Sequence, residues 1–148
     1  MALISGRVLA LDVGKKRVGL AVTDPLGLTA QGLPTLHRGR VREDFDFLVR
    51  LCTEYQVTRL LIGRPLHLSG DESRQAQYTD EFGLRLSELT HIPVTYLDER
   101  LTSVQATRML RDVGSSTDRR TGAVDRMAAV LLLQNYLEKQ EFAEDRVD

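Results

Sequence analysis

Apolar residues occupy both faces of a short segment near the N-terminus. The segment Arg7–Asp12 reads RVLALD, and every position between its two charged ends is apolar. A strand with two apolar faces lies inside a sheet and is covered on both sides. A second apolar segment, Arg17–Thr23, follows after a few residues that include Gly14. So short a connection joins antiparallel neighbours, and the pattern therefore predicts a hairpin at the start of the chain.

Beyond the hairpin, the apolar residues alternate between helical and extended spacing. The turn sequence DPLG at 24–27 separates the hairpin from a third predicted strand. Apolar stripes at helical spacing predict helices, and short apolar runs predict buried strands. The predicted strands after the hairpin cover about 28–37, 58–63 and 94–97, and the predicted helices cover about 43–52, 72–89, 102–113 and 124–137.

This order of elements predicts an α/β fold. We expect a five-stranded mixed sheet in the order 3-2-1-4-5, with only the second strand antiparallel and with helices on both faces. The length of 148 residues matches one domain, which we expect to span 1–138. Residues 139–148 are acidic and lose all periodicity, so they are predicted to form a disordered tail.

Composition narrows the class of protein. The single cysteine, Cys52, excludes a disulfide framework and a cysteine-based zinc site. No apolar run has the length of a signal peptide or of a membrane span, so we expect a cytoplasmic protein without membrane contact. The net charge of −1 does not by itself indicate a nucleic-acid-binding protein. Any such function therefore has to come from local clusters of charge.

Acidic residues stand at three places where a site can form. Asp12 ends the first strand, Asp98 and Glu99 end another, and Asp125 lies near the start of the last helix. Sites in open α/β sheets form outside the carboxyl ends of the strands, so these groups are expected to converge. Carboxylates without His or Cys suit Mg²⁺ or Mn²⁺, and a pair of such ions can catalyse phosphodiester hydrolysis.

Each acid also has a simpler explanation. Asp12 can shape the hairpin turn, Asp98 can cap the next helix, and Asp125 can be an ordinary acid of a first helical turn. Chance alone would have to bring all three groups to the same edge of the sheet. The pattern therefore favours a common site. Adjacent strand residues point to opposite faces, so the pattern leaves open whether Asp98 or Glu99 belongs to that site.

Basic residues flank each of the acids. Around the predicted site they can contact the phosphates of a nucleic acid, and they can equally pair with the neighbouring acids. The candidate substrate-binding residues are Lys15, Lys16, Arg17, Arg100 and Arg126.

Four blocks of the sequence resemble the YqgF/RuvX family. They read LALDVGKKRVGLAVTD, IGRPLHLSG, VTYLDERLTSVQA and VDRMAAVLLLQNYL, and together they extend from Val8 to Leu137. The resemblance implies a ribonuclease H-like fold and a metal-dependent nuclease. It further implies that Asp12, Glu99 and Asp125 are the catalytic, metal-binding acids, with Asp98 and Arg100 adjoining them.

The second block departs from the family pattern at three positions. Arg64 replaces a small or apolar residue, His67 replaces an amide, and Ser69 replaces an acid or amide. These changes leave the predicted metal-binding acids intact. They bear only on the contacts that this loop makes with a substrate.

The resemblance implies a role in maturing the end of the small-subunit (16S) ribosomal RNA during ribosome biogenesis. The family was also named for its similarity to Holliday junction resolvases, so cleavage of branched DNA is the alternative. Its partners would be nucleic acid and ribosomal particles, and the chain would act as a monomer or homodimer.

Two other functions fit parts of the sequence. The hairpin resembles the phosphate loop of actin-like ATPases and sugar kinases, but these enzymes need two such lobes and this chain offers one. A non-catalytic module that binds RNA or the ribosome would also keep the fold. The presence of Asp12, Glu99 and Asp125 together argues for the nuclease.

Overall fold

The protein is built on one five-stranded sheet. The computed structural model describes residues 6–65, 70–99, 107 and 121–145. The strands lie in the order β3-β2-β1-β4-β5, with β2 antiparallel to both of its neighbours and the other pairs parallel. The predicted fold class and strand order are therefore confirmed. The strands are β1 (Arg7–Val13), β2 (Arg17–Thr23), β3 (Ala30–His37), β4 (Val57–Pro65) and β5 (Val94–Glu99).

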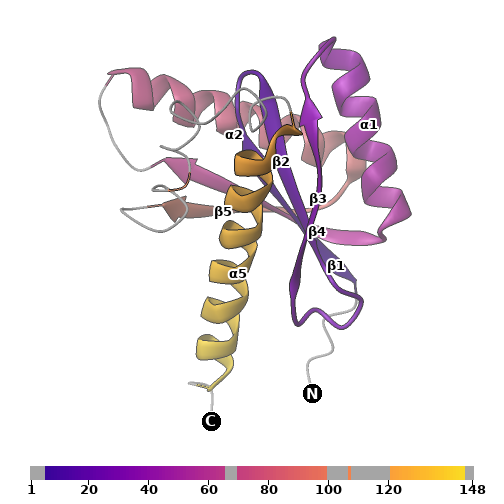
Figure 1. Ribbon diagram of the computed structural model, residues 1–148, viewed down its shortest axis with the longest axis vertical. Helices are drawn as coiled ribbons and strands as arrows, with labels where there is room; N and C mark the ends of the chain where they lie inside the picture. Colours follow the sequence, from indigo (N-terminus) through magenta and orange to yellow (C-terminus); the bar gives the residue numbers. More distant parts are fainter. Residues whose placement is uncertain (1–5, 66–69, 100–106, 108–120, 146–148) are drawn as a thin grey trace.

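Helices cover both faces of this sheet (Figure 1). Helices α1 (Val41–Glu54) and α2 (Gly70–Thr90) pack on one face, and α5 (Ala123–Asp145) packs on the other. The helix predicted over 102–113 lies outside the described residues, apart from residue 107. The helical backbone of α5 continues to Asp145, and so enters the segment for which the sequence predicted a disordered tail.

Large side chains fill the layer between the sheet and the α1/α2 pair. Leu9 and Leu11 of β1 face this layer, where they meet Leu48 of α1 and Leu86 of α2. All four side chains are fully buried. Burial of a leucine side chain contributes about 1.5–3 kcal/mol, so this layer supplies a large part of the stability of the fold.

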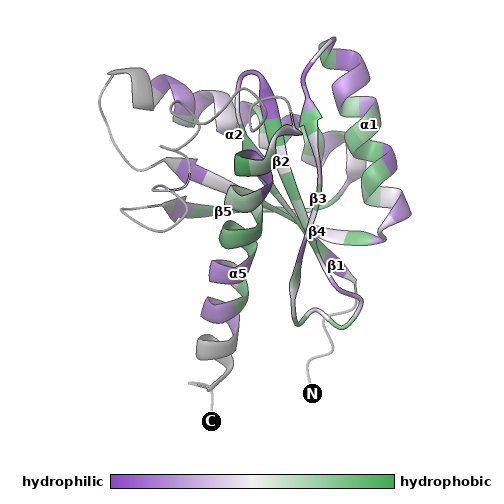
Figure 2. Ribbon diagram, in the orientation of Figure 1, coloured by the Kyte–Doolittle hydropathy of each residue, from purple (hydrophilic) through white to green (hydrophobic). Residues whose placement is uncertain are grey.

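The layer between the sheet and α5 combines small side chains with the leucines Leu61, Leu132 and Leu133. Val8 and Ala10 of β1 and Ala21 of β2 lie against Ala128 and Ala129 of α5. Methyl-sized side chains let the helix approach the strands closely. The turns of α5 that pack on the sheet are largely hydrophobic, and more hydrophilic turns follow them along the helix (Figure 2). Within the part of the chain that is described, no helix is both long and apolar enough to cross a membrane.

The turn between β2 and β3 is organised by Asp24. Its Oδ1 accepts hydrogen bonds from the backbone N–H groups of Leu28 (2.7 Å) and Thr29 (2.6 Å), and its Oδ2 accepts one from Leu26 (3.2 Å). These bonds, the one from Thr29 above all, lower the pKa of the Asp24 carboxyl from its ordinary value. The last aspartate of the hairpin motif is therefore a turn-forming residue.

The thiol of Cys52 should react only when the protein unfolds. Its side chain is buried in the α1/α2 layer, and burial raises the pKa of the thiol to about 11. Only the thiolate reacts with iodoacetamide, and an increase of two pKa units lowers the thiolate fraction about 100-fold. We expect negligible labelling of the native protein at pH 8 and full labelling in denaturant, as measured by intact mass. Equal labelling rates in the two states would contradict the burial of Cys52.

Candidate active site

Asp12 lies near the end of β1, on the face of the sheet that α5 covers. It comes two residues after Ala10, which packs in the α5 layer, and successive residues of a strand alternate between faces. Its exposed fraction is only 1%. Its cross-strand partner in β2 is Gly19. A carboxylate thus stands buried at the C-terminal end of a central strand, as the sequence predicted.

The first turn of α5 rests directly on Gly19. A Cβ atom added at Gly19 would lie 2.0 Å from the backbone carbonyl oxygen of Asp125, a distance that no real side chain tolerates. Glycine is therefore required at this position of β2. Because Gly19 is also the strand partner of Asp12, the contact brings the backbone of Asp125 next to the end of β1.

Arg17 fixes the side chain of Asp125. Its Nε donates a hydrogen bond of 2.8 Å to Oδ2 of the carboxylate. The side chains of Arg17 and Asp125 are 17% and 1% exposed, so the pair is largely shielded from water. Hydrogen bonds between ionised groups are among the stronger ones in proteins, and this one joins the start of β2 to α5. Arg17, predicted as a substrate-binding residue, therefore has a partner within the protein.

The start of α5 is held on β3 as well. Oγ1 of Thr35 donates a hydrogen bond of 2.7 Å to the carbonyl oxygen of Gly122, which precedes the helix and has a φ of 69°. One turn later the stem of Arg126 lies over Gly32, where an added Cβ would lie 2.8 Å from Cγ of the arginine. Arg126 thus packs its stem on β3, while the residue as a whole is exposed.

Alternation along β5 separates Asp98 from Asp12. Tyr96 packs in the α1/α2 layer and Leu97 in the α5 layer. Asp98 therefore shares the face of Tyr96, and it is exposed. The side chain of Glu99 and the whole of Arg100 lie outside the described residues. Among the described side chains, no three of His, Cys, Asp and Glu are grouped closely enough to hold a metal ion.

The tip of the β1–β2 hairpin carries the two predicted lysines. Lys15 and Lys16 are both exposed. Arg38 holds the hairpin in place through hydrogen bonds. The sequence pattern did not single out this residue. The backbone N–H of Arg38 donates to the carbonyl oxygen of Lys16 (2.9 Å), and its Nη1 donates to that of Gly14 (3.3 Å). An arginine that closes a hairpin through backbone contacts leaves no periodic signal in a sequence.

Arg64, which departs from the family pattern, has a structural partner. Its Nη2 lies 3.0 Å from Oδ2 of Asp80, so the ion pair joins the end of β4 to α2. Both side chains are about two-fifths exposed, and such pairs stabilise a fold by at most about 1 kcal/mol. The other two departures, His67 and Ser69, lie outside the described residues.

Comparison with known proteins supports the resemblance seen in the motifs. The model of the RuvX family, described as "Holliday junction resolvase", matches residues 6–139. A protein of Koribacter versatilis is 45% identical over 93% of this chain and 90% of its own length. One of Streptococcus equi subsp. zooepidemicus is 44% identical over 89% of this chain and 97% of its own. Both are named "Putative pre-16S rRNA nuclease".

A solved structure shares the fold at much lower identity. It is titled as RuvC of Thermus thermophilus in complex with a Holliday junction substrate. Its TM-score is 0.57 at 13% identity, and the match covers 91% of this chain and 96% of that one. The architecture described above is therefore shared with that protein.

Replacing Gly19 with alanine should loosen α5 from the sheet. The new methyl group collides with the backbone of Asp125, so the helix has to shift, and overpacking of this kind costs about 1–3 kcal/mol. We expect a lower melting temperature for Gly19→Ala. Gly39→Ala is the matched control, because nothing lies within 4 Å of its added Cβ, and its melting temperature should be unchanged. Equal melting temperatures of the two variants would contradict the close contact.

Proposed function

Because this chain belongs to the RuvX family, we propose that it is a nuclease that hydrolyses phosphodiester bonds in structured nucleic acid. The observation that carries the proposal is the arrangement of Asp12 and Asp125. Both carboxylates are 1% exposed, and they come from opposite ends of the chain to neighbouring positions on the α5 face. Burial of charged groups is costly, so such an arrangement points to function rather than to stability.

The donor set suits a hard divalent cation. Carboxylate oxygens are the ligands that Mg²⁺ and Mn²⁺ prefer, so Asp12 and Asp125 fit such an ion. A bound pair of these ions would activate water and stabilise the leaving oxygen of the phosphodiester. The protein's own contribution is to hold the ligands rigidly, with Asp12 on a central strand and Asp125 on a helix fixed by Arg17.

We propose Glu99 rather than Asp98 as the third acid. Position 99 follows Leu97 by two residues, and Leu97 packs in the α5 layer. By alternation, position 99 belongs to the same face of the sheet as Asp12. Asp98 belongs to the other face and is exposed. The sequence pattern left both acids open, and the alternation along β5 supports Glu99.

The substrate we propose is a precursor of the 16S ribosomal RNA. Support comes from the names of the relatives, which match at 44–45% identity over nearly their whole length. The setting would be the cytoplasm, where ribosomal particles mature. Branched DNA is the second candidate, favoured by the description of the family. Both candidate substrates are nucleic acids. With either of them, Lys16 at the hairpin tip and Arg100 would contact the phosphates.

Asp12→Asn should abolish cleavage without unfolding the protein. The change removes one charged ligand and keeps the shape of the side chain, so we expect activity to fall at least about 1000-fold with a native melting curve. Precursor 16S RNA and a four-way DNA junction would be assayed side by side with Mg²⁺, Mn²⁺ or chelator. Asp46→Asn, at an exposed position of α1, is the control and should cut normally. A folded Asp12→Asn protein that cuts at the wild-type rate would refute the proposed site.

A paired substitution distinguishes the two neighbouring acids of β5. We expect Glu99→Gln to lose metal-dependent cleavage and Asp98→Asn to retain most of it, because only position 99 belongs to the face of Asp12. Both changes remove one negative charge, so each serves as the control of the other. The measurement is the initial cleavage rate as a function of Mg²⁺ concentration. The opposite result would place Asp98 in the metal site.

A further inference from the structure

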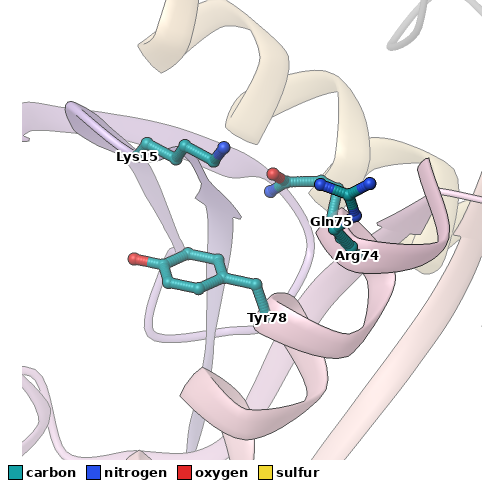
Figure 3. A pocket seen from close by; sticks show the side chains of 4 residues that line it. All are labelled: Lys15, Arg74, Gln75 and Tyr78. Atoms are coloured by element: carbon teal, nitrogen blue, oxygen red, sulfur yellow. The ribbon is translucent and has the colours of Figure 1, made fainter. Parts of the chain in front are cut away.

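A cavity lies between the β1–β2 hairpin and α2. Its volume is about 620 Å³, within the range of sites that hold small ligands. The described residues that line it are Lys15, Arg74, Gln75 and Tyr78. Two of them are cationic, and none of these four is acidic. Figure 3 shows Lys15 reaching from the hairpin towards Gln75, with the ring of Tyr78 on the adjoining wall.

The aromatic wall of the cavity is held in place from behind. The guanidinium of Arg38 donates a hydrogen bond to the hydroxyl group of Tyr78 and lies 5.6 Å from the centroid of its ring. Nε of the same guanidinium lies 3.5 Å from Oδ2 of Asp44 in α1. Tyr78 itself is half-buried. Its ring is therefore oriented before any ligand binds, which lowers the entropic cost of binding.

The cavity and the acidic site share the end of β1. Nε2 of Gln75 donates a hydrogen bond of 3.3 Å to the backbone carbonyl oxygen of Val13, the residue after Asp12. Val13 packs in the α1/α2 layer, whereas Asp12 belongs to the α5 face. The cavity therefore adjoins the proposed catalytic residues across the thickness of the sheet, with the hairpin tip between them.

We propose that this cavity binds one unpaired nucleotide of the substrate strand, with its phosphate at Lys15 and Arg74 and its base against Tyr78. The inference rests on the proposed function, since it takes nucleic acid as the substrate. Cationic side chains position phosphates, and aromatic rings stack on unpaired bases. The bases of a duplex are stacked on one another and do not reach such a wall. The preferred substrate therefore has a single-stranded segment next to the cleaved bond.

Direct binding measurements test this proposal without cleavage. Fluorescence anisotropy would give the Kd of the full chain, in chelator, for a labelled single-stranded RNA and for a blunt duplex of the same sequence. We expect tighter binding of the single strand. Replacing both Lys15 and Arg74 with alanine should weaken that binding at least about tenfold. The double variant Arg42→Ala/Arg50→Ala removes the same charge from exposed positions of α1 and should stay within about twofold of wild type.

Substitutions of Tyr78 test the stacking wall separately. Tyr78→Phe keeps the ring but loses the hydrogen bond from Arg38, so it should retain most of the single-strand affinity, whereas Tyr78→Leu should lose about tenfold. Melting curves show whether both Tyr78 variants are folded. If Tyr78→Leu unfolds, the Lys15→Ala/Arg74→Ala variant still tests the cavity, because both of its positions are exposed. Normal binding by the Lys15→Ala/Arg74→Ala variant, or equal affinity for duplex and single strand, would overturn the proposal.

The two proposals fail in different ways. If the wild-type protein cuts no substrate but the Lys15→Ala/Arg74→Ala variant loses single-strand affinity, the nuclease proposal is refuted and the cavity proposal stands. Wild-type cleavage with unchanged affinity in that variant would refute the cavity alone.

Discussion

The contact between Gly19 and the backbone of Asp125 is the constraint on which the proposed site depends. It sets the position of the first turn of α5, and with it the place of one of the two buried carboxylates. Arg17 adds a hydrogen bond to the carboxylate itself, and Thr35 holds the residue before the helix. Three contacts to β2 and β3 thus fix a helix whose sequence position is far from both strands. Such redundancy gives the rigid placement that a catalytic constellation requires.

The hairpin motif can now be explained residue by residue. Asp12 is the buried acid, and Gly14 closes the turn, its N–H donating to the carbonyl oxygen of Arg17. Gly19 leaves room for the backbone of α5, and Ala21 packs against the same helix. Asp24, which carries a charge like that of Asp12, only shapes the next turn. Acids of the same motif thus have different roles, and burial distinguishes them.

Much of the fold could be predicted from the sequence because it follows from local patterns. The double-faced apolar strand, the short hairpin and the helical stripes determine the order of the sheet. Asp12 and Asp125 could be singled out because strand ends and helix starts leave clear signals. The proposal of Glu99 rather than Asp98 rests on the packing of Tyr96 and Leu97, which depends on tertiary contacts. Arg38 and the cavity beside Tyr78 could not be predicted, since they arise from side chains of separate elements that meet only in the folded chain.

The two layers that flank the sheet differ in how freely their sequences can change. In the α1/α2 layer, leucine, isoleucine and phenylalanine side chains share one volume, so a loss at one position can be compensated at another. Next to α5, Ala10, Ala21, Ala128 and Ala129 pack beside the leucines Leu61, Leu132 and Leu133, and an alanine has no side-chain volume to give up. A larger residue in place of one of these alanines should push the helix off the sheet and carry Asp125 away from β1. The placement of the proposed catalytic acids therefore tolerates sequence changes in the α1/α2 layer and depends on the size of single side chains in the α5 layer.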